Sequence, residues 1–196
     1  MRQTSADIDR LWGIIRASPT IESVLSRAGE IDLADGHLCA GCIAQTVWNH
    51  GTGRPPDHGI RDLDLIYYDP ADLTESGEAS AAARIAGLLA DIPAAIDVKN
   101  EARVHLWYES RFGIPIAPYG SVAEAVDSFP TTATAVAIAL RDGDSRIVAP
   151  FGLGDLLGLV VRPNKRQIDR PVYEAKVPRW RRLWPELTYL AWSDSD

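Results

Sequence analysis

GIRDLDLIYYD, residues 59–69, is the stretch that decides the fold. Leu63 and Leu65 alternate with Asp62 and Asp64, which is the two-residue period of a strand with one apolar face. The two carboxylates therefore project from the same face. At a separation of ~4 Å they repel by about 4 kcal/mol at an effective dielectric near 20. A divalent cation relieves this repulsion, and Mg²⁺ prefers hard oxygen ligands. Two solvated acids on an edge strand are the alternative interpretation.

Features on either side of this strand favour the metal hypothesis. Upstream, Gly41 separates a strand expected at 37–40 from a helix expected at 42–49. There the backbone can approach a phosphate closely, and the helix N–H groups can bind it. Downstream, Asp97 interrupts an otherwise apolar strand, and Lys99 has the same strand parity. A third carboxylate beside the first two would complete a site for two Mg²⁺ ions, and the lysine can reach a phosphate.

The rest of the chain mixes helical and strand patterns, so we expect an α+β domain with a mixed sheet. Helices are expected at 8–15, 20–28, 75–90, 122–128 and 153–160, and strands at 62–68, 95–98, 103–108, 135–140 and 146–149. The DGDS run at 142–145 is typical of a hairpin. An amphipathic helix is expected near the C-terminus, beginning or kinking at Pro178. Residues 1–30 are interpreted as a helical layer on a main domain of residues 31–196.

Composition excludes several classes of protein. The chain has 196 residues, of which 46% are hydrophobic, and a net charge of −7, so a generally basic nucleic-acid binder is not expected. Residues 162–182 are the exception, with eight Lys and Arg against Asp169 and Glu174. This asymmetry predicts that the basic segment faces an anion or the acidic part of its own fold. We see no leader peptide, no apolar run of ~20 residues and only two cysteines, so a cytoplasmic protein without a membrane partner is expected.

Beyond these patterns, residues 38–192 resemble a bacterial family described as nucleotidyltransferase-like, within the DNA polymerase β-type nucleotidyltransferase superfamily. The resemblance rests on the order strand, glycine turn, helix, D-x-D strand and later lone acid. Six runs together make it specific: AGCIAQTVWN, GIRDLDLIYYD, DVKNEARVHLWY, FPTTATAVAI, APFGLGDLLGLVVRPN and RWRRLWPEL.

The resemblance implies the fold of that superfamily and transfer of a nucleoside monophosphate from a triphosphate, with release of pyrophosphate. It implies that Gly41 lines the phosphate site and that Asp62, Asp64 and Asp97 ligate metal. The acceptor would be a small molecule or a protein, and nucleic acid is not favoured. The residues that we expect to bind the nucleotide are Gly41, Cys42, Arg54, Lys99 and Arg103.

One departure from the related enzymes leaves a second hypothesis open. In the similar heads of tRNA nucleotidyltransferases and poly(A) polymerases, a glycine pair is followed by Arg-Asp. Here the pair is Ala40-Gly41, and the corresponding positions read Ala44-Gln45. The chain could therefore be a non-catalytic module that binds a nucleotide or another anion. Three arginines are candidates to replace the missing one: Arg54, Arg61 and Arg103.

Several other residues each have both a structural and a functional interpretation. Cys39 and Cys42 form a lone C-x-x-C without a second pair, so packing in a tight turn is favoured over a zinc site. His105 is more simply a structural histidine than an acid–base group. Trp180 and Trp184 share a helix face, which favours packing. If both were exposed, they would instead mark a docking face of an adaptor protein.

Overall fold

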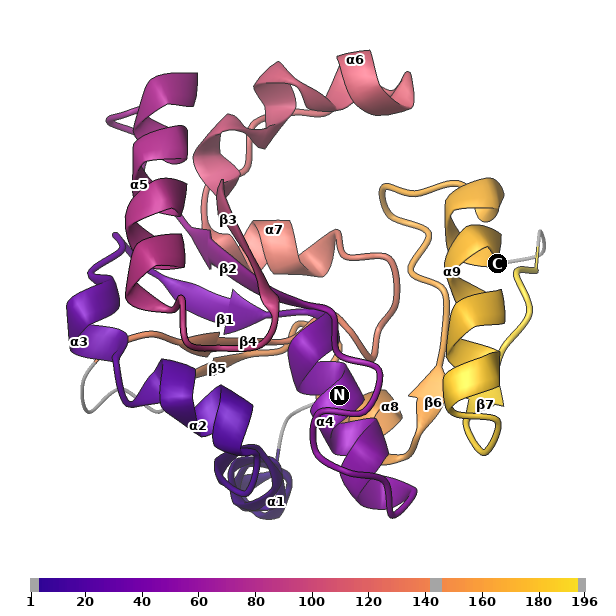
Figure 1. The fold of residues 1–196 in the computed structure, drawn as a ribbon. Coiled ribbons are helices and arrows are strands. Elements are labelled where there is room, and N and C mark those ends of the chain that lie inside the picture. Colours follow the sequence, from indigo (N-terminus) through magenta and orange to yellow (C-terminus); the bar gives the residue numbers. More distant parts are fainter. Residues whose placement is uncertain (1–3, 142–145, 194–196) are drawn as a thin grey trace.

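A five-stranded mixed sheet forms the centre of the molecule (Figure 1). The computed structural model describes residues 4–141 and 146–193. Along the sheet the order is β3-β2-β1-β4-β5, with β2 and β3 parallel and the other neighbours antiparallel. The strands are β1 (His37–Cys39), β2 (Asp62–Tyr67), β3 (Ala95–Asn100), β4 (Ala137–Ala139) and β5 (Ile147–Val148).

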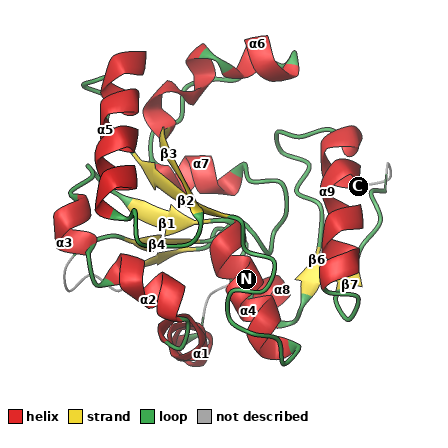
Figure 2. Ribbon diagram, in the orientation of Figure 1, coloured by secondary structure: helices red, strands yellow, loops and turns green. Residues whose placement is uncertain are grey.

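Helices cover both faces of this sheet, as the secondary-structure colouring shows (Figure 2). The main core lies on the face of Leu63 and Leu65, against helices α1 (Ser5–Arg16), α2 (Pro19–Leu25), α4 (Gly41–Gly51) and α5 (Glu75–Leu88). The face of Ile66 packs against α7 (Val122–Asp127) in a smaller cluster. The short helix α3 (Ala28–Ile31) contacts α5. The residues of the N-terminal helices thus share one apolar core with the sheet.

A C-terminal unit stands beside the sheet (Figure 1). It consists of α8 (Gly154–Leu157), the parallel strands β6 (Val160–Val161) and β7 (Thr188–Tyr189), and helix α9 (Arg170–Leu183). Trp48 of α4 joins the two parts, because its ring lies 5.5 Å from that of Trp180 and 5.3 Å from that of Trp184. Trp180 and Trp184 are buried, which counts against an adaptor docking face at these residues.

Most expected elements are confirmed within a few residues, and three are corrected. Residues 103–108 are not a strand: they form the 3₁₀ helix η1 (Glu101–Leu106) and the start of α6 (Tyr108–Phe112). The side chain of Asn100 accepts a hydrogen bond from the Ala102 N–H at 3.1 Å and thereby starts η1. The helix expected at 153–160 is only the single turn α8. The DGDS hairpin lies outside the described residues.

The third correction concerns the C-terminal helix, which begins at Arg170 and continues through Pro178. Its N-cap is Asp169, whose carboxylate accepts a hydrogen bond from the Val172 N–H at 3.3 Å. This cap places the start of the helix two turns before the proline. None of the helices within residues 4–141 and 146–193 has the length and apolar character needed to span a bilayer. The α+β class with a mixed sheet and flanking helices is confirmed.

Candidate functional site

Strand register places the three acidic residues of interest on one face of the sheet. In the parallel pair β2–β3, Asp64 lies directly opposite Asp97, and Asp62 lies opposite Ala95. Paired residues of neighbouring strands project to the same side, as do residues two apart on one strand. Asp62, Asp64 and Asp97 therefore share a face, although 32 intervening residues separate Asp64 from Asp97 in the sequence.

Asp64 is the most enclosed of these carboxyl groups. Its pKa is raised to about 6, chiefly by burial and then by the charges of Asp62 and Asp97, against the opposing effects of Lys176 and of a backbone hydrogen bond from Gly41. Desolvation and like charges both disfavour the ionised form of a carboxyl group. A cation bound between these groups would relieve both effects.

The turn between β1 and α4 brings backbone close to this carboxylate. Ala40 has φ 58° and ψ −123°, a left-handed conformation that L-residues rarely adopt, and its N–H donates to the Val136 carbonyl at 2.9 Å. The positive φ thus falls on Ala40 and not on Gly41. A Cβ atom at Gly41 would lie 3.0 Å from Gln45 Nε2 and 3.9 Å from Asp64 Oδ2. Glycine at 41 keeps this space open beside the first turn of α4.

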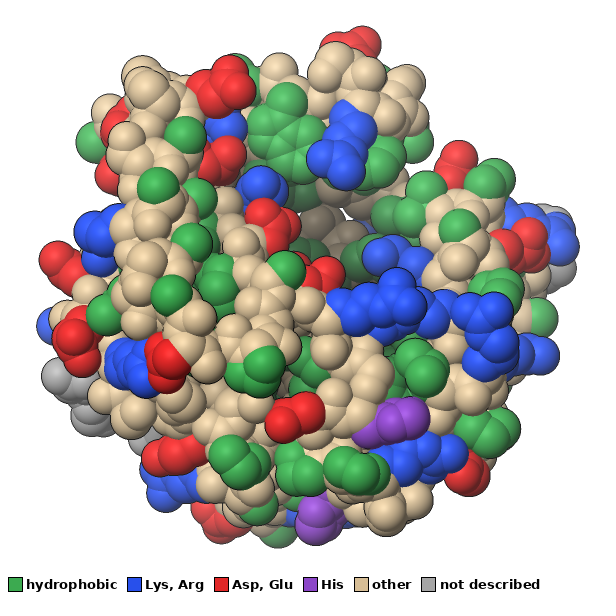
Figure 3. Space-filling view, viewed as in Figure 1, with side chains coloured by type: hydrophobic (Ala, Val, Ile, Leu, Met, Phe, Trp, Pro, Cys, Tyr) green, Lys and Arg blue, Asp and Glu red, His purple; other side chains and the backbone are tan. Residues whose placement is uncertain are grey.

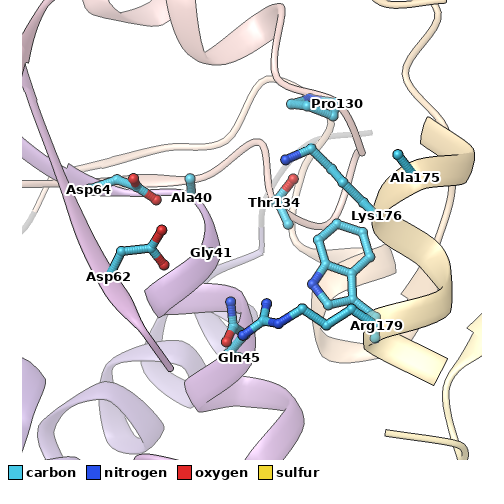
Figure 4. Close-up of a pocket in the computed structure, with 11 residues that line it drawn as sticks. Ala40, Gly41, Gln45, Asp62, Asp64, Pro130, Thr134, Ala175, Lys176 and Arg179 are labelled. Atoms are coloured by element: carbon cyan, nitrogen blue, oxygen red, sulfur yellow. The ribbon is translucent and has the colours of Figure 1, made fainter. Parts of the chain in front are cut away.

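A cavity of about 290 Å³ opens between the sheet and α9, and we call it the carboxylate cavity. In the space-filling view, acidic groups lie at the left of the central hollow, beside a basic group, and a larger basic patch lies at its right (Figure 3). The close-up shows Asp62 and Asp64 on one wall and the side chains of Lys176 and Arg179 extending from α9 on the other (Figure 4). The lining residues are Ala40, Gly41, Gln45, Asp62, Asp64, Pro130, Thr134, Ala175, Lys176, Arg179 and Trp180.

Two polar groups in these walls lack a hydrogen-bond partner. Gln45 is 4% exposed, and its Oε1 is buried without a partner. Arg179 donates from Nη2 to the Gly59 carbonyl at 2.6 Å, whereas its Nε is buried without a partner. Burial and the nearby Arg61 lower the pKa of Arg179. Buried polar groups are normally satisfied, so unpaired ones in a cavity wall indicate a polar ligand. Because the amide of Gln45 can rotate, it can offer either an acceptor or a donor.

A second cavity, of about 500 Å³, adjoins the first and shares Pro130 and Lys176 with it. We call it the aromatic cavity. Asp97 and Lys99 stand at its wall, where Lys99 Nζ lies 3.0 Å from Asp97 Oδ1. Both side chains of this ion pair are about half exposed, at 40% for the lysine and 51% for the aspartate. Asp97 therefore faces the aromatic cavity, while Asp62 and Asp64 face the carboxylate cavity.

Glu101, which the sequence interpretation missed, is a buried carboxyl group in the wall of the aromatic cavity. Its pKa is raised to about 8, chiefly by burial and then by the charges of Glu78, Asp64 and Asp97, while Lys99 opposes this rise. The unfolded chain releases this proton near pH 4.5. Between these values the folded state binds more protons than the unfolded state, so the free energy of unfolding decreases as pH rises.

We therefore expect Glu101→Gln to unfold like the wild type at pH 4 and to be more stable above about pH 8. The glutamine cannot ionise, so the decline between these pH values should be smaller in the variant. Urea denaturation from pH 4 to pH 9 measures this difference. Glu109→Gln, an exposed glutamate on α6, is the matched control and should follow the wild type. Identical pH profiles for Glu101→Gln and the wild type would contradict the raised pKa.

Of the expected nucleotide-binding residues, Arg54, Arg103 and Cys42 line neither of the two cavities. Arg54 pairs with Glu186 at 2.9 Å, and Arg103 pairs with Glu78 at 2.6 Å in a buried ion pair. Cys42 donates from Sγ to the Cys39 carbonyl at 3.2 Å. Burial raises the pKa of both cysteine thiols, as expected for small residues packed in a turn. Lys99 is the member of this group that joins Asp97 at a cavity wall.

The basic segment, residues 162–182, supplies cations to the carboxylate cavity. They come from helix α9 and not from residues 162–169, which precede it. Arg162 pairs with Asp155 at 2.8 Å, and Arg166 pairs with Asp127. Lys176 and Arg179, one helical turn apart on α9, are the ones that line the carboxylate cavity. The charge asymmetry of residues 162–182 signalled this segment. It could not indicate which of the eight cations face the acids, because that depends on how α9 packs.

The donor set suits a metal that is shared with a substrate. Among the described residues, no three His, Cys, Asp or Glu side chains gather closely enough to form a complete cage for a metal ion. Mg²⁺ is usually held by one or two carboxylates together with substrate phosphates and water. Asp62 and Asp64 at one cavity wall meet that requirement, and the raised pKa of Asp64 reflects first its burial and then the charge repulsion, both of which a cation would relieve.

Comparisons with known proteins identify the family and the fold of the chain. The sequence matches the family described as Nucleotidyltransferase over residues 26–189. A solved structure described as a CCA-adding enzyme head domain has a TM-score of 0.74 and 24% identity, covering 94% of this chain and 96% of that one. A CCA-adding enzyme in complex with CTP has a TM-score of 0.47 and 16% identity, and the chain covers 40% of its length. No curated protein matches.

The fold is therefore that of a nucleotidyltransferase head domain. The chain belongs to the nucleotidyltransferase family.

Proposed function

We propose that the chain is a Mg²⁺-dependent nucleotidyltransferase, which transfers a nucleoside monophosphate from a triphosphate to an acceptor and releases pyrophosphate. One observation carries the proposal: Asp64 is paired in register with Asp97, and it faces Lys176 and Arg179 across a cavity. Acids that can hold a metal and cations that can hold phosphate thus meet around one space, as transfer of a phosphoryl group requires.

Asp62 and Asp64 would hold the metal, with triphosphate oxygens and water as the remaining ligands. When bound there, Mg²⁺ would neutralise charge on the phosphates and stabilise the leaving pyrophosphate. Support comes from the shared face of the two side chains and from the burial and charge repulsion that raise the pKa of Asp64. Asp97 would be the third catalytic carboxylate, on the side of the site where the acceptor binds.

The triphosphate would lie between the start of α4 and α9. Lys176 and Arg179 offer positive charge, and the unpartnered Arg179 Nε and the amide of Gln45 offer further hydrogen bonds. The space at Gly41 lets phosphate approach the first turn of α4, and N–H groups at the start of a helix bind anions. On this proposal the arginine that is absent after the Ala40-Gly41 turn is replaced from α9, and not by Arg54 or Arg103.

Asp97 would take the proton from the acceptor. Its side chain is half exposed on the aromatic cavity, and Lys99 holds one of its oxygens at 3.0 Å. In the transfer step the acceptor oxygen forms a bond with the α-phosphorus, and the bond from that phosphorus to the pyrophosphate oxygen breaks. The acceptor proton passes to the Asp97 carboxylate, and the electron pair leaves with pyrophosphate.

Calorimetric titration with ATP, GTP, CTP and UTP, with and without Mg²⁺, tests the binding half of the proposal. We expect Mg²⁺-dependent binding of a triphosphate. We expect Arg179→Ala and Lys176→Ala each to weaken it by about tenfold or more, because each removes a charge-assisted contact to phosphate.

Arg182→Ala is the matched control, since Arg182 is exposed on the same helix and does not line the cavity. Its nucleotide affinity should equal that of the wild type. Equal weakening in all three variants would mean that general positive charge, and not this cavity, attracts the nucleotide. No binding of any triphosphate would refute the proposed function.

A non-catalytic nucleotide-binding module is the second candidate, and the Ala44-Gln45 pair in place of Arg-Asp favours it. Both candidates predict nucleotide binding, so the discriminating measurement is pyrophosphate release with the bound nucleotide and a panel of acceptors. Binding without any release would favour the module.

A further inference from the structure

The aromatic cavity lies on the acceptor side of Asp97, and the proposed function leaves the identity of its occupant open. It is lined by Asp97, Lys99, Glu101, Val104, Trp107, Tyr108, Arg111, Phe112, Ile114, Tyr119, Ser128, Phe129, Pro130, Gln167, Ile168, Asp169, Val172 and Lys176. Its volume of about 500 Å³ is within the range of small-molecule sites. The cavity is lined by residues of both α6 and α9, which lie above and to the right of the central hollow in this view (Figures 1 and 3).

Aromatic rings of α6 and of Trp107, which lies between η1 and α6, form one side of this cavity. The rings of Tyr108 and Phe112 lie 4.6 Å apart, and that of Trp107 lies 6.5 Å from Phe112. The guanidinium of Arg111 lies 6.0 Å from the Trp107 ring and 5.6 Å from the Phe112 ring. Phe112 and Ile114 remain 44% and 37% exposed at this position. Large apolar groups that stay exposed at the mouth of a cavity indicate a flat, apolar ligand.

The polar groups of the cavity can orient such a ligand without favouring a polyanion. Tyr119 bonds with Ser128 at 2.9 Å and with Gln167 at 2.7 Å, so its hydroxyl is already engaged. Glu101 retains its proton at neutral pH, because its pKa is raised to about 8, and it can therefore donate a hydrogen bond. A neutral hydrogen-bond donor such as the Glu101 carboxyl, beside aromatic side chains, suits a ligand that has an aromatic ring and a hydroxyl group.

Charge in the cavity argues against a polynucleotide end. Binding of single-stranded nucleic acid combines stacking with a positively charged track along the backbone. Here Lys99 is paired with Asp97, and Asp169 stands in the same wall as Lys176. The net charge of the chain is −7. The cations therefore do not form an uninterrupted basic track leading out of this cavity.

We propose that the aromatic cavity binds the acceptor, a small molecule with an aromatic ring and a hydroxyl group, and directs that hydroxyl toward Asp97. The inference rests on the proposed function, because it assigns the acceptor of the same transfer. The ring would lie against Trp107, Tyr108 and Phe112. The donor nucleotide would occupy the adjoining carboxylate cavity at the same time.

The test uses 8-anilinonaphthalene-1-sulfonate, an aromatic fluorescent probe, titrated into the folded full chain at pH 7. We expect saturable binding that Phe112→Ala weakens by about fivefold to tenfold, since the variant removes apolar contact area. Leu106→Ala is the matched control, because Leu106 is 56% exposed on the neighbouring η1 and does not line the cavity. It should bind the probe like the wild type. Circular dichroism confirms that both variants are folded.

Two competition arms decide the occupant. A saturating concentration of the triphosphate that binds, with Mg²⁺, should leave the affinity for the probe unchanged, since the two ligands occupy adjoining cavities. A single-stranded RNA dodecamer should not displace the probe. Displacement by the nucleotide would assign the cavity to the nucleotide base, and displacement by the RNA would assign it to a nucleic-acid acceptor. Either outcome would overturn the inference, as would equal probe binding by Phe112→Ala and Leu106→Ala.

Calorimetric titration of the same sample with the triphosphate tests the proposed function independently of the probe, because it measures nucleotide binding. Nucleotide binding without probe binding would refute only the assignment of the aromatic cavity. Probe binding without any nucleotide binding would refute the proposed function, and with it the acceptor role of the cavity.

Discussion

Replacing Asp64 with asparagine is expected to lower the rate of nucleotidyl transfer by at least about 10³-fold and to raise the stability of the metal-free protein. The loss follows because a metal at a reacting phosphate supplies several kcal/mol of stabilisation, and about 4 kcal/mol corresponds to about 10³-fold in rate. The gain in stability follows because asparagine removes a charge whose pKa burial and two neighbouring carboxylates have raised to about 6.

A lower transfer rate together with a higher stability would show that Asp64 serves function and not the fold. Pyrophosphate release measures the rate of nucleotidyl transfer, and thermal unfolding at pH 7 without Mg²⁺ measures the stability. Asp57→Asn, in the loop before β2 and outside both cavities, is the matched control and should change neither. Full turnover in Asp64→Asn would refute the metal-binding role. A large loss of stability would show that Asp64 serves the fold.

Replacing Arg103 with methionine is expected to destabilise the protein by about 3 kcal/mol without changing its affinity for the triphosphate. Arg103 and Glu78 form an ion pair at 2.6 Å, with side chains only 10% and 12% exposed. Removing one partner of a buried pair leaves the other charge uncompensated, which typically costs about 3–5 kcal/mol. Glu78 Oε2 also accepts a hydrogen bond from the Asn100 N–H at 2.8 Å, so the pair fixes α5 to the end of β3.

Urea denaturation and calorimetry together test this prediction. The double variant Arg103→Met/Glu78→Met should recover part of the lost stability, because it removes both charges. Arg27→Met is a control for an exposed pair, since its partner Asp91 is 60% exposed, and it should cause a much smaller loss. If Arg103→Met were as stable as the wild type but bound the triphosphate about tenfold more weakly, Arg103 would be a nucleotide-binding residue, as the sequence predicted.

Strand β2 illustrates what could be predicted from sequence. The alternation of leucine and aspartate is a local pattern, and the structure confirms a strand at Asp62–Tyr67 with Leu63 and Leu65 buried. The prediction for residues 103–108 was wrong for a physical reason. Their alternation is compatible with a strand, but burial of Arg103 against Glu78 on α5 and the cap by Asn100 favour a 3₁₀ helix. Both of those contacts involve partners outside the segment.

The two cavities illustrate what sequence could not place. Gly41 and Asp64 were candidates because their residue types and spacing carry a local meaning, and their roles stay predictions. Gln45, Glu101 and Arg179 have no such pattern: they became candidates only through burial and through the cavity that each one lines. The charge asymmetry of the C-terminal segment indicated that it would face an anion or the acidic part of its own fold, but it could not identify the residues.

The sequence by itself determined the strands and most helices of the central domain, the shared face of Asp62 and Asp64, and the resemblance to nucleotidyltransferases. These follow from periods of two and 3.6 residues, which are properties of the local backbone. Only the tertiary structure decided that Asp97 stands opposite Asp64, that Lys176 and Arg179 face the carboxylates, and that Arg54 and Arg103 do not. Strand register and helix packing depend on contacts between segments far apart in the chain, and no local period encodes them.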